Sequence, residues 1–245
     1  PNIIGERQMS KLLKDYNYDK FEYNELQEHI DAALSDCSWA KDDYNNTQME
    51  SWEDVPGWIN DAQWIFKEVV GNCKDGDKVV ELGTYFGQSA CYMGELIRDS
   101  GKDIKFDTFD TFEQLEPSMR AGMQPKAIVD YRFHKGRHTA PMSIIVKSHF
   151  EACGVDDYVN LIICDAFYSH HFYQDDSLMM FYNDGINEQN ALYKLMSNFW
   201  PKIKKGGLMA GDDINFDDVK SAVNKFCKEN NLKYEHTPLS WVIRK

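Results

Sequence analysis

The stretch Val79-Val80-Glu81-Leu82-Gly83-Thr84-Tyr85-Phe86-Gly87-Gln88-Ser89 decides the fold of this chain. Its apolar start predicts a buried strand, and the residues after Gly87 follow a helical pattern. Gly83 permits a tight turn and close backbone approach, and the free N–H groups at the helix start favour an anionic group such as a carboxylate. The glycines stand four residues apart, which is the wrong spacing for the G-x-G-x-x-G turn of a dinucleotide site. The alternative interpretation is an ordinary strand–helix turn.

Strand-like and helix-like segments alternate along the chain from residue 78 onward. We expect strands over 78–82, 104–110, 158–164, 178–182, 207–211, 233–236 and 241–243, and helices over 88–99, 141–153, 189–200 and 217–229. This alternation predicts an α/β fold with a mainly parallel sheet that helices cover on both faces. Ligands of such sheets bind at the carboxyl ends of the strands.

Residues 1–70 contain no strand-like run and predict an N-terminal helical extension, which serves as a cap or a dimer element. The main domain is then expected over 71–245, with a lid or substrate insertion near 111–139, where no regular element fits. A helix that starts near Pro56 would place apolar residues on one face: Ile59, Ala62, Phe66 and Val69. The extension also contains four tryptophans, for which the sequence leaves three roles open: lining a substrate pocket, forming a dimer interface, or packing in the core. They are Trp39, Trp52, Trp58 and Trp64.

The composition excludes several classes of protein. The chain has 245 residues, of which 42% are hydrophobic, enough apolar area to offset chain entropy, so a disordered protein is excluded. The formal net charge of −13 disfavours a nucleic-acid partner. No apolar run approaches the roughly 20 residues that span a bilayer. The six cysteines are scattered without a C-x-x-C pair, which favours a reducing cytoplasm.

Acidic residues follow the second and third expected strands. Asp110 ends the second strand, where a carboxylate can accept hydrogen bonds from both hydroxyls of a ribose. Asp165 ends the third strand and is suited to accept a hydrogen bond from an exocyclic amine, while Ala166 and Phe112 are suited to flank a flat base. In both cases the alternative is an aspartate that caps a turn.

Three further aspartates follow neighbouring strands: Asp184 after the fourth, and Asp212 and Asp213 after the fifth. Clustered carboxylates repel one another unless a cation joins them, and hard oxygen ligands suit Mg²⁺ or Ca²⁺. A magnesium ion held there would bind two adjacent substrate hydroxyls and lower the pKa of one of them. The alternative is that these acids solvate a loop or cap a helix.

Taken together, these motifs resemble a known family. The E-x-G-x-x-x-G-x-S turn, the acid after the second strand, the C-D-A after the third, the D-G after the fourth and the G-G-x-x-x-G-D-D strand occur in register over about 78–245. This set is similar to class I S-adenosylmethionine-dependent methyltransferases, closest to small-molecule O-methyltransferases of the macrocin and catechol type. The resemblance implies a Rossmann-like sheet of seven strands whose last strand is antiparallel.

The resemblance also implies roles for matched positions. The residues that would bind S-adenosylmethionine are Glu81, Gly83, Thr84, Tyr85, Gly87, Ser89, Asp110, Thr111, Phe112, Asp165, Ala166 and Asp184. Asp184, Asp212 and Asp213 would match the metal ligands of the metal-dependent branch. The chain departs from the D-G-x-H pattern that relatives often show, because Asn187 occupies the histidine position.

Two histidines after the third strand are candidates for the general base. His170 and His171 are expected near the cofactor end of the sheet, and histidine titrates near neutral pH. The segment 131–138 is the only dense basic patch of the sequence. It either recognises an acidic substrate or, as we prefer, is a solvated loop.

The sequence therefore predicts an enzyme that transfers a methyl group from S-adenosylmethionine to a hydroxyl of a small sugar-like or phenol-like acceptor, with help from Mg²⁺. Methylation of nucleobase nitrogens is disfavoured, since the Asn/Asp-Pro-Pro-aromatic tetrad of those enzymes is missing after the fourth strand. The alternatives are a cofactor-binding scaffold without catalysis, and aminopropyl transfer on the same fold. We expect no membrane and no nucleic-acid partner, and either a monomer or a homodimer.

Overall fold

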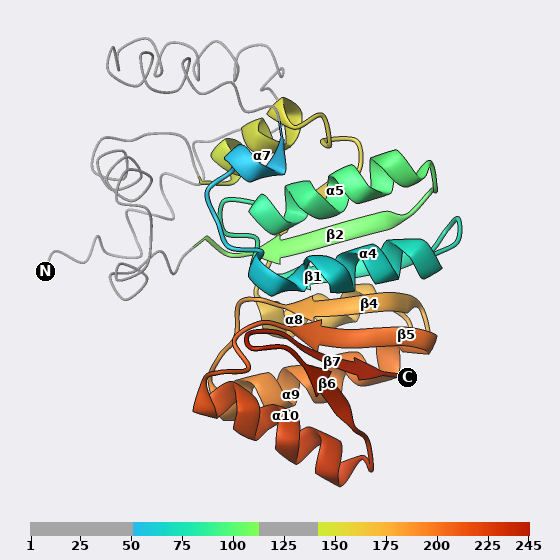
Figure 1. Ribbon diagram of the computed structural model, residues 1–245, viewed down its shortest axis with the longest axis vertical. Coiled ribbons are helices and arrows are strands. Elements are labelled where there is room, and N and C mark those ends of the chain that lie inside the picture. Colours follow the sequence, from blue (N-terminus) through green and yellow to red (C-terminus); the bar gives the residue numbers. More distant parts are fainter. Residues whose placement is uncertain (1–50, 113–141) are drawn as a thin grey trace, which may run out of the picture. The chain divides into compact units, whose positions relative to one another are not determined.

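The computed structural model describes residues 51–112 and 142–245. Its seven strands form one sheet in the order β3-β2-β1-β4-β5-β7-β6 (Figure 1). The strands are β1 (Lys78–Leu82), β2 (Lys105–Asp110), β3 (Val159–Ile163), β4 (Leu178–Asn183), β5 (Ile203–Gly211), β6 (Tyr234–His236) and β7 (Trp241–Arg244). The first five strands pair in parallel, while β7 runs antiparallel to both β5 and β6. The predicted Rossmann-like fold with an antiparallel last strand is thereby confirmed.

Helices cover both faces of this sheet. The longer helices are α4 (Gln63–Asn72), α5 (Gln88–Ser100), α7 (Met142–Ala152), α9 (Gln189–Phe199) and α10 (Asp217–Glu229), and α8 (Ala166–Ser169) is a single turn. Short 3₁₀ turns are η2 (Trp52–Asp54), η3 (Asn60–Ala62), η5 (His170–Phe172) and η6 (Trp200–Lys202). Figure 1 shows α4 and α5 side by side on one face of the sheet, and α9 beside α10 at its other end.

Each face of the sheet has its own apolar core. Residues of α4, α5 and α7 pack with Val79 of β1 in one cluster, and residues of α9 and α10 pack with Val80 and Leu82 in the other. Successive residues of a strand point to opposite faces, so Glu81 shares the face of Val79. This alternation brings a carboxylate to the α4–α5 face, next to the turn that follows β1.

The helix expected near Pro56 begins later than predicted. Only η3 and α4 are helical, although the four residues expected on its inner face are all buried. Gly57 explains the delay, because its extended backbone lies against α5, where an added Cβ would be 2.6 Å from Cβ of Gln88. The strand β5 begins at Ile203, four residues before its predicted start, because pairing with β4 already starts at Leu178 and Ile203.

The described part of the N-terminal extension belongs to the same compact unit as the sheet, since that unit runs from Met49 to Lys245. Most of the extension, including Trp39, lies outside the described residues, as does nearly all of the predicted insertion at 111–139. The division of the chain at residue 70 therefore stays a prediction. None of the helices in the described ranges is long and apolar enough to cross a membrane.

Candidate cofactor and acceptor site

The turn between β1 and α5 is built for close approach. Gly83 has a φ of +95°, and an added Cβ would lie 2.1 Å from the carbonyl oxygen of Asp184 at the end of β4. Gly87 has a φ of +90° and precedes α5, where an added Cβ would be 2.8 Å from the Phe150 ring of α7. Side chains are excluded at both positions. The turn 83–87, called the glycine cradle below, therefore presents bare backbone at Gly83 and Gly87, at the carboxyl ends of two neighbouring strands.

Asp110 holds this turn from the neighbouring strand. Its Oδ2 accepts a hydrogen bond from the N–H of Tyr85 at 2.9 Å, and its Oδ1 accepts one from the N–H of Phe112 at 2.7 Å. Both donors have positive φ angles, +52° and +55°, so the carboxylate supports two strained residues. Each carboxylate oxygen has a second lone pair, which leaves Asp110 able to accept from ribose hydroxyls as well.

Glu81 is buried beside the cradle. Thr108 of β2 donates a hydrogen bond to Glu81 Oε2 at 2.9 Å, and the Thr108 hydroxyl lies 2.7 Å from that of Thr84. Burial raises the pKa of Glu81 to about 7, although the hydroxyls of Ser89 and Thr108 lower it. Within the described residues, Oε1 makes no hydrogen bond of ordinary geometry. A buried carboxylate oxygen without a donor is an unusual cost, and a cationic ligand group beside it would remove that cost.

The end of β3 is more exposed than the cradle. Asp165 accepts a hydrogen bond from the N–H of Phe167 at 2.8 Å and so caps α8. This is the turn-capping role that the sequence left open as an alternative. Ala166 is half-buried against the α9–α10 core, and Phe112 packs against the α4–α5 core on the other face. Whether these three border a base stays a prediction.

The three aspartates expected to bind a metal do approach one another. Burial, and then the charges of Asp212, Glu81 and Asp213, raise the pKa of Asp184 well above its usual range. Burial raises the pKa of Asp212 to about 6, and its Oδ1 has no hydrogen-bond partner among the described residues. Over residues 51–112 and 142–245, however, no group of three His, Cys, Asp or Glu side chains is arranged to hold a metal ion. The donor set does not fit magnesium as it stands.

Asn187 explains part of that misfit. Its Nδ2 donates to Asp213 Oδ2 at 2.7 Å, which occupies a carboxylate oxygen that a metal would need. The backbone of Asp213 has a φ of +63°. The departure from D-G-x-H was the signal in the sequence for this contact, although the partner of Asn187 could not be read from it.

The two candidate histidines lie in the turn η5. The His170 ring is 6.2 Å from that of Phe199 at the end of α9, and 3.9 Å from that of His171. Burial, and then the charge of His171, lower the pKa of His170, with smaller effects from Lys202 and Lys194. Phe199 and Lys202 adjoin the start of β5, so the His170 ring packs toward that element. The Phe172 ring of the same turn lies 5.7 Å from that of Phe109, near the carboxyl end of β2, so a role of the two histidines as general base stays a prediction.

Sequence reasoning missed two supports of the cradle. His149 of α7 is buried, and its Nδ1 lies 2.8 Å from the carbonyl oxygen of Phe86 in the turn. Trp58 is 46% exposed, and its ring stacks on that of Tyr85 with a centroid separation of 5.8 Å. Neither residue belongs to a motif, so only the fold reveals that they contact the turn. The other two described tryptophans of the N-terminal extension, Trp52 and Trp64, pack partly buried against the α4–α5 core.

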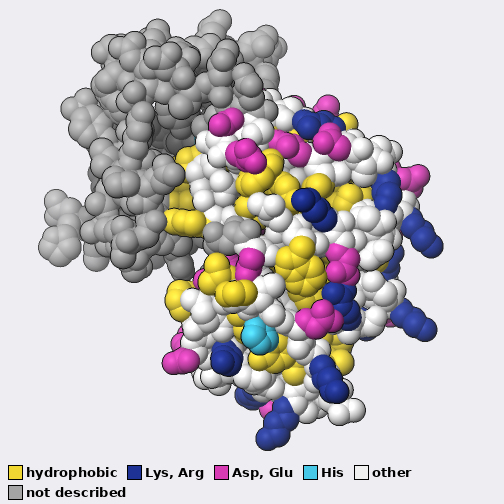
Figure 2. Space-filling view, in the orientation of Figure 1, with side chains coloured by type: hydrophobic (Ala, Val, Ile, Leu, Met, Phe, Trp, Pro, Cys, Tyr) yellow, Lys and Arg dark blue, Asp and Glu magenta, His cyan; other side chains and the backbone are white. Residues whose placement is uncertain are grey.

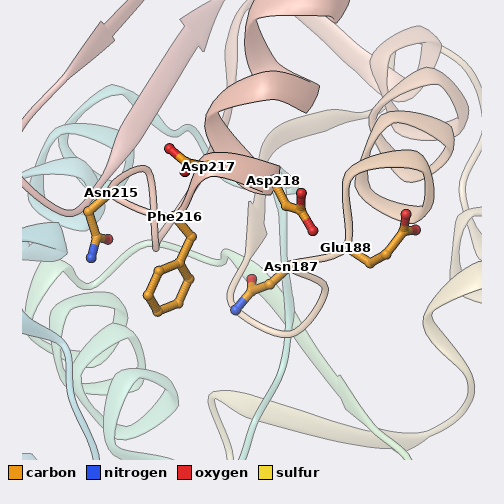
Figure 3. A pocket seen from close by; sticks show the side chains of 6 residues that line it. All are labelled: Asn187, Glu188, Asn215, Phe216, Asp217 and Asp218. Carbon is orange, nitrogen blue, oxygen red and sulfur yellow. The ribbon is translucent and has the colours of Figure 1, made fainter.

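An open pocket of about 570 Å³ adjoins the ends of β4 and β5 (Figure 3). It is lined by Asn187, Glu188, Asn215, Phe216, Asp217 and Asp218. Figure 3 shows that Phe216 and Asn187 extend toward the same space from the two loops. The pocket therefore combines an exposed aromatic ring, two carboxamides and three acids, a set that suits a polar molecule with hydroxyl groups.

Charge is divided between the two ends of the parallel strands. Lysines begin β1 and β2 and occupy the start of β5, as Lys78, Lys105 and Lys204. The carboxyl ends instead carry the acids described above. On the face seen in Figure 2, Lys and Arg side chains lie mainly on the side opposite to the carboxyl ends of the strands. The cradle thus offers an acidic environment, which attracts a positively charged ligand.

The glycine turn, the Glu81 Oε1 that makes no hydrogen bond of ordinary geometry among the described residues, and the remaining lone pairs of Asp110 fit S-adenosylmethionine, whose methionine end carries an ammonium group. Fold and site together define a class I S-adenosylmethionine-dependent methyltransferase. A family model described as a methyltransferase domain matches residues 80–214, more than half of the chain. The chain therefore belongs to this methyltransferase family.

Solved structures agree on the fold. The O-methyltransferase NovP superposes with a TM-score of 0.55 at 18% identity, over 75% of this chain and 79% of NovP. The Podospora anserina methyltransferase PaMTH1, bound to SAH (S-adenosylhomocysteine), superposes with a TM-score of 0.51 at 13% identity, over 100% of this chain and 98% of PaMTH1. No curated protein matches the chain.

Proposed function

We propose that this protein transfers the methyl group of S-adenosylmethionine to a hydroxyl oxygen of a small, polar acceptor. The observation that carries the proposal is Glu81 beside the glycine turn: its Oε1 is buried and makes no hydrogen bond of ordinary geometry among the described residues. The cofactor supplies an activated methyl group on a sulfonium when it is bound.

Binding and alignment are the main tasks of these residues. Glu81 faces the ammonium group, Asp110 accepts hydrogen bonds from the ribose, and the first N–H groups of α5, which have no partner within the helix, bind the methionine carboxylate. The acceptor occupies the pocket beside Asn187 and Phe216. Holding the two reactants in line lowers the barrier by several kcal/mol, on the order of 7 kcal/mol in favourable cases.

The hydroxyl proton needs an acceptor, and Asp212 is the described carboxylate best suited to this task. Its pKa of about 6 leaves it mostly ionised at neutral pH, and its Oδ1 is free of hydrogen bonds among the described residues. We prefer Asp212 to His170, because the His170 ring packs 6.2 Å from that of Phe199 at the end of α9 and burial lowers the His170 pKa.

Oxygen is the favoured acceptor atom for two reasons. The chain reads Asn183-Asp184-Gly185-Ile186 after β4, without the proline pair of enzymes that methylate nucleobase nitrogens. The acids of the pocket and the net charge of −13 also disfavour a nucleic-acid substrate, because they repel its phosphate backbone. A sugar-like or phenol-like small molecule fits these constraints, in a reducing cytoplasm and with no membrane partner. Association into homodimers stays a prediction, whereas the described side chains do not support the assistance by Mg²⁺ that the sequence predicts.

Two measurements test the proposal. Calorimetric titration of S-adenosylhomocysteine should show saturable binding at one site per chain. Incubation with methyl-labelled S-adenosylmethionine and a panel of hydroxylated acceptors should then transfer label to at least one of them. A folded protein that binds no S-adenosylhomocysteine would contradict the cofactor assignment. Binding without transfer to any acceptor would favour a scaffold, and transfer only from decarboxylated S-adenosylmethionine would favour aminopropyl transfer.

A further inference from the structure

Thr108 lies in the middle of β2, two residues before Asp110, and belongs to no motif of the sequence. It is fully buried, as is Glu81, and Thr84 is 1% exposed. The three side chains form a continuous path: Thr108 lies 2.9 Å from Glu81 Oε2 and 2.7 Å from the Thr84 hydroxyl. Buried polar side chains are expensive unless they are hydrogen-bonded, so this arrangement on the α4–α5 face calls for an explanation.

The number of available protons gives the path a direction. A hydroxyl has one proton to donate and two lone pairs with which to accept. Thr108 donates its proton to Glu81 Oε2, so it can only accept from Thr84. The Thr84 proton is therefore committed to Thr108 and is not available to a ligand. Thr84 ties the turn after β1 to β2 through Thr108, and its predicted contact with the cofactor stays a prediction.

The consequence for Glu81 is a defined orientation. One carboxylate oxygen is held by Thr108, and the other, Oε1, is left buried and without a hydrogen bond of ordinary geometry among the described residues. Without the Thr108 hydroxyl, Oε2 loses its hydrogen-bond donor, and the Ser89 hydroxyl is the described group that still lowers the pKa of the carboxyl. Preorganised groups bind a ligand more tightly than groups that must be ordered on binding.

We propose that Thr108 is a positioning residue for the cofactor: its hydroxyl, supported by Thr84, fixes the Glu81 carboxylate so that Oε1 receives the ammonium group of the methionine end. This inference rests on the proposed cofactor site. It makes Thr108 a determinant of selectivity for the amino group, although Thr108 itself does not touch the cofactor.

The test compares two ligands by calorimetry: S-adenosylhomocysteine and its analogue with hydrogen in place of the amino group. The wild type should prefer the natural ligand. Thr108→Val should weaken S-adenosylhomocysteine by about tenfold, the scale of one charge-assisted hydrogen bond, and the analogue by less than about threefold. Thr108→Ser keeps the hydroxyl and should restore the preference. Glu81→Gln should lose the same preference and serves as the reference.

Thr108→Val places a methyl group against a carboxylate, so its folding is checked by thermal melting. If it does not fold, Thr108→Ala makes the same comparison, because it removes the hydroxyl without adding a methyl group there. Equal weakening of both ligands, or an unchanged preference in a folded variant, would overturn the inference. A wild type that binds neither ligand would instead overturn the proposed function, so the two failures are distinguishable.

Discussion

Gly83 lies where the ends of β1 and β4 come closest. Its N–H donates to the carbonyl oxygen of Phe109, while the Asp184 N–H donates to that of Leu82. These contacts fix the backbone on both sides of the glycine, so the structure cannot relax easily around a larger residue.

We expect Gly83→Ala to abolish binding of S-adenosylhomocysteine and to lower the free energy of unfolding by about 3 kcal/mol or more, from overpacking and a left-handed φ. Gly76→Ala is the matched control, since Gly76 has a φ of +85° and no heavy atom within 4 Å of an added Cβ. It should cost only the conformational strain, about 1–2 kcal/mol. Urea unfolding measures the stability of the two variants, and calorimetry measures their affinity for S-adenosylhomocysteine. Equal losses in the two variants would refute the role of the close approach.

Glu81 links the site to pH. Its pKa is raised from 4.5 to about 7 by burial, so between these values the folded protein holds a proton that the unfolded chain has lost. The free energy of unfolding therefore falls as pH rises through this window, by at most about 3 kcal/mol. Melting of the ligand-free protein should show a steeper fall from pH 5 to pH 8 in the wild type than in Glu81→Gln. Parallel curves would show that Glu81 does not titrate there.

At the scale of elements, β2 supports the turn that follows β1. Its residues alternate between the two faces: Asp110 accepts from the turn, while Asp107 accepts from the Tyr173 hydroxyl at 2.6 Å and from Asn160 at 2.8 Å. The strand β2 thus carries two aspartates that each accept two hydrogen bonds but lie at different points along the strand. Only the one at the carboxyl end belongs to the cradle.

This pair makes a sharp comparison. Asp110→Ala should reduce affinity for S-adenosylhomocysteine by at least about tenfold, because it removes the ribose acceptor and frees the turn. Asp107→Ala should leave the affinity within about twofold, while both variants lose on the order of 1–3 kcal/mol of stability from unsatisfied donors. Calorimetry and urea unfolding report the two effects separately. Equal affinity losses would mean that β2 acts only as structural support.

At the scale of the whole molecule, the separation of charge decides which ligands approach the sheet. Acids at the carboxyl ends of β1, β2, β4 and β5 face no described lysine or arginine that forms an ion pair with them, since the described ion pairs involve other acids. A cationic ligand satisfies this environment. A metal ion is a second way to satisfy it, but the described side chains do not form a metal-binding group.

We therefore expect that adding millimolar Mg²⁺, or removing it with EDTA, leaves the melting temperature of the protein with S-adenosylhomocysteine unchanged within about one degree. A bound metal would raise it, because a ligand present at a hundred times its Kd stabilises the folded state by roughly 2.7 kcal/mol. Calorimetric scanning with and without Mg²⁺ checks this. A melting temperature that rises with Mg²⁺ in the wild type, but not in Asp212→Asn, would instead support the metal site predicted from the sequence.

The sequence by itself determined the elements with strong local patterns. The predicted bounds of β1 and α10 agree with the structure, because a continuous apolar run and a 3.6-residue period are local properties. The glycine cradle and the acids at strand ends followed from the same patterns, since parallel strands bring their carboxyl ends to one edge. The delayed start of α4 and the early start of β5 escaped prediction, because packing against Gln88 and pairing with β4 override local propensity.

Only the tertiary structure decided which of these residues meet. His170 is close in sequence to the end of β3, yet its ring lies 6.2 Å from that of Phe199 at the end of α9. Thr108, His149 and Trp58 carry no motif, yet they contact Glu81, Phe86 and Tyr85. Side-chain contacts between strands and helices depend on register and on the path of the chain, which are long-range properties. Residue types therefore predicted the chemistry of the site, whereas the register of β1 and β2 determined its geometry.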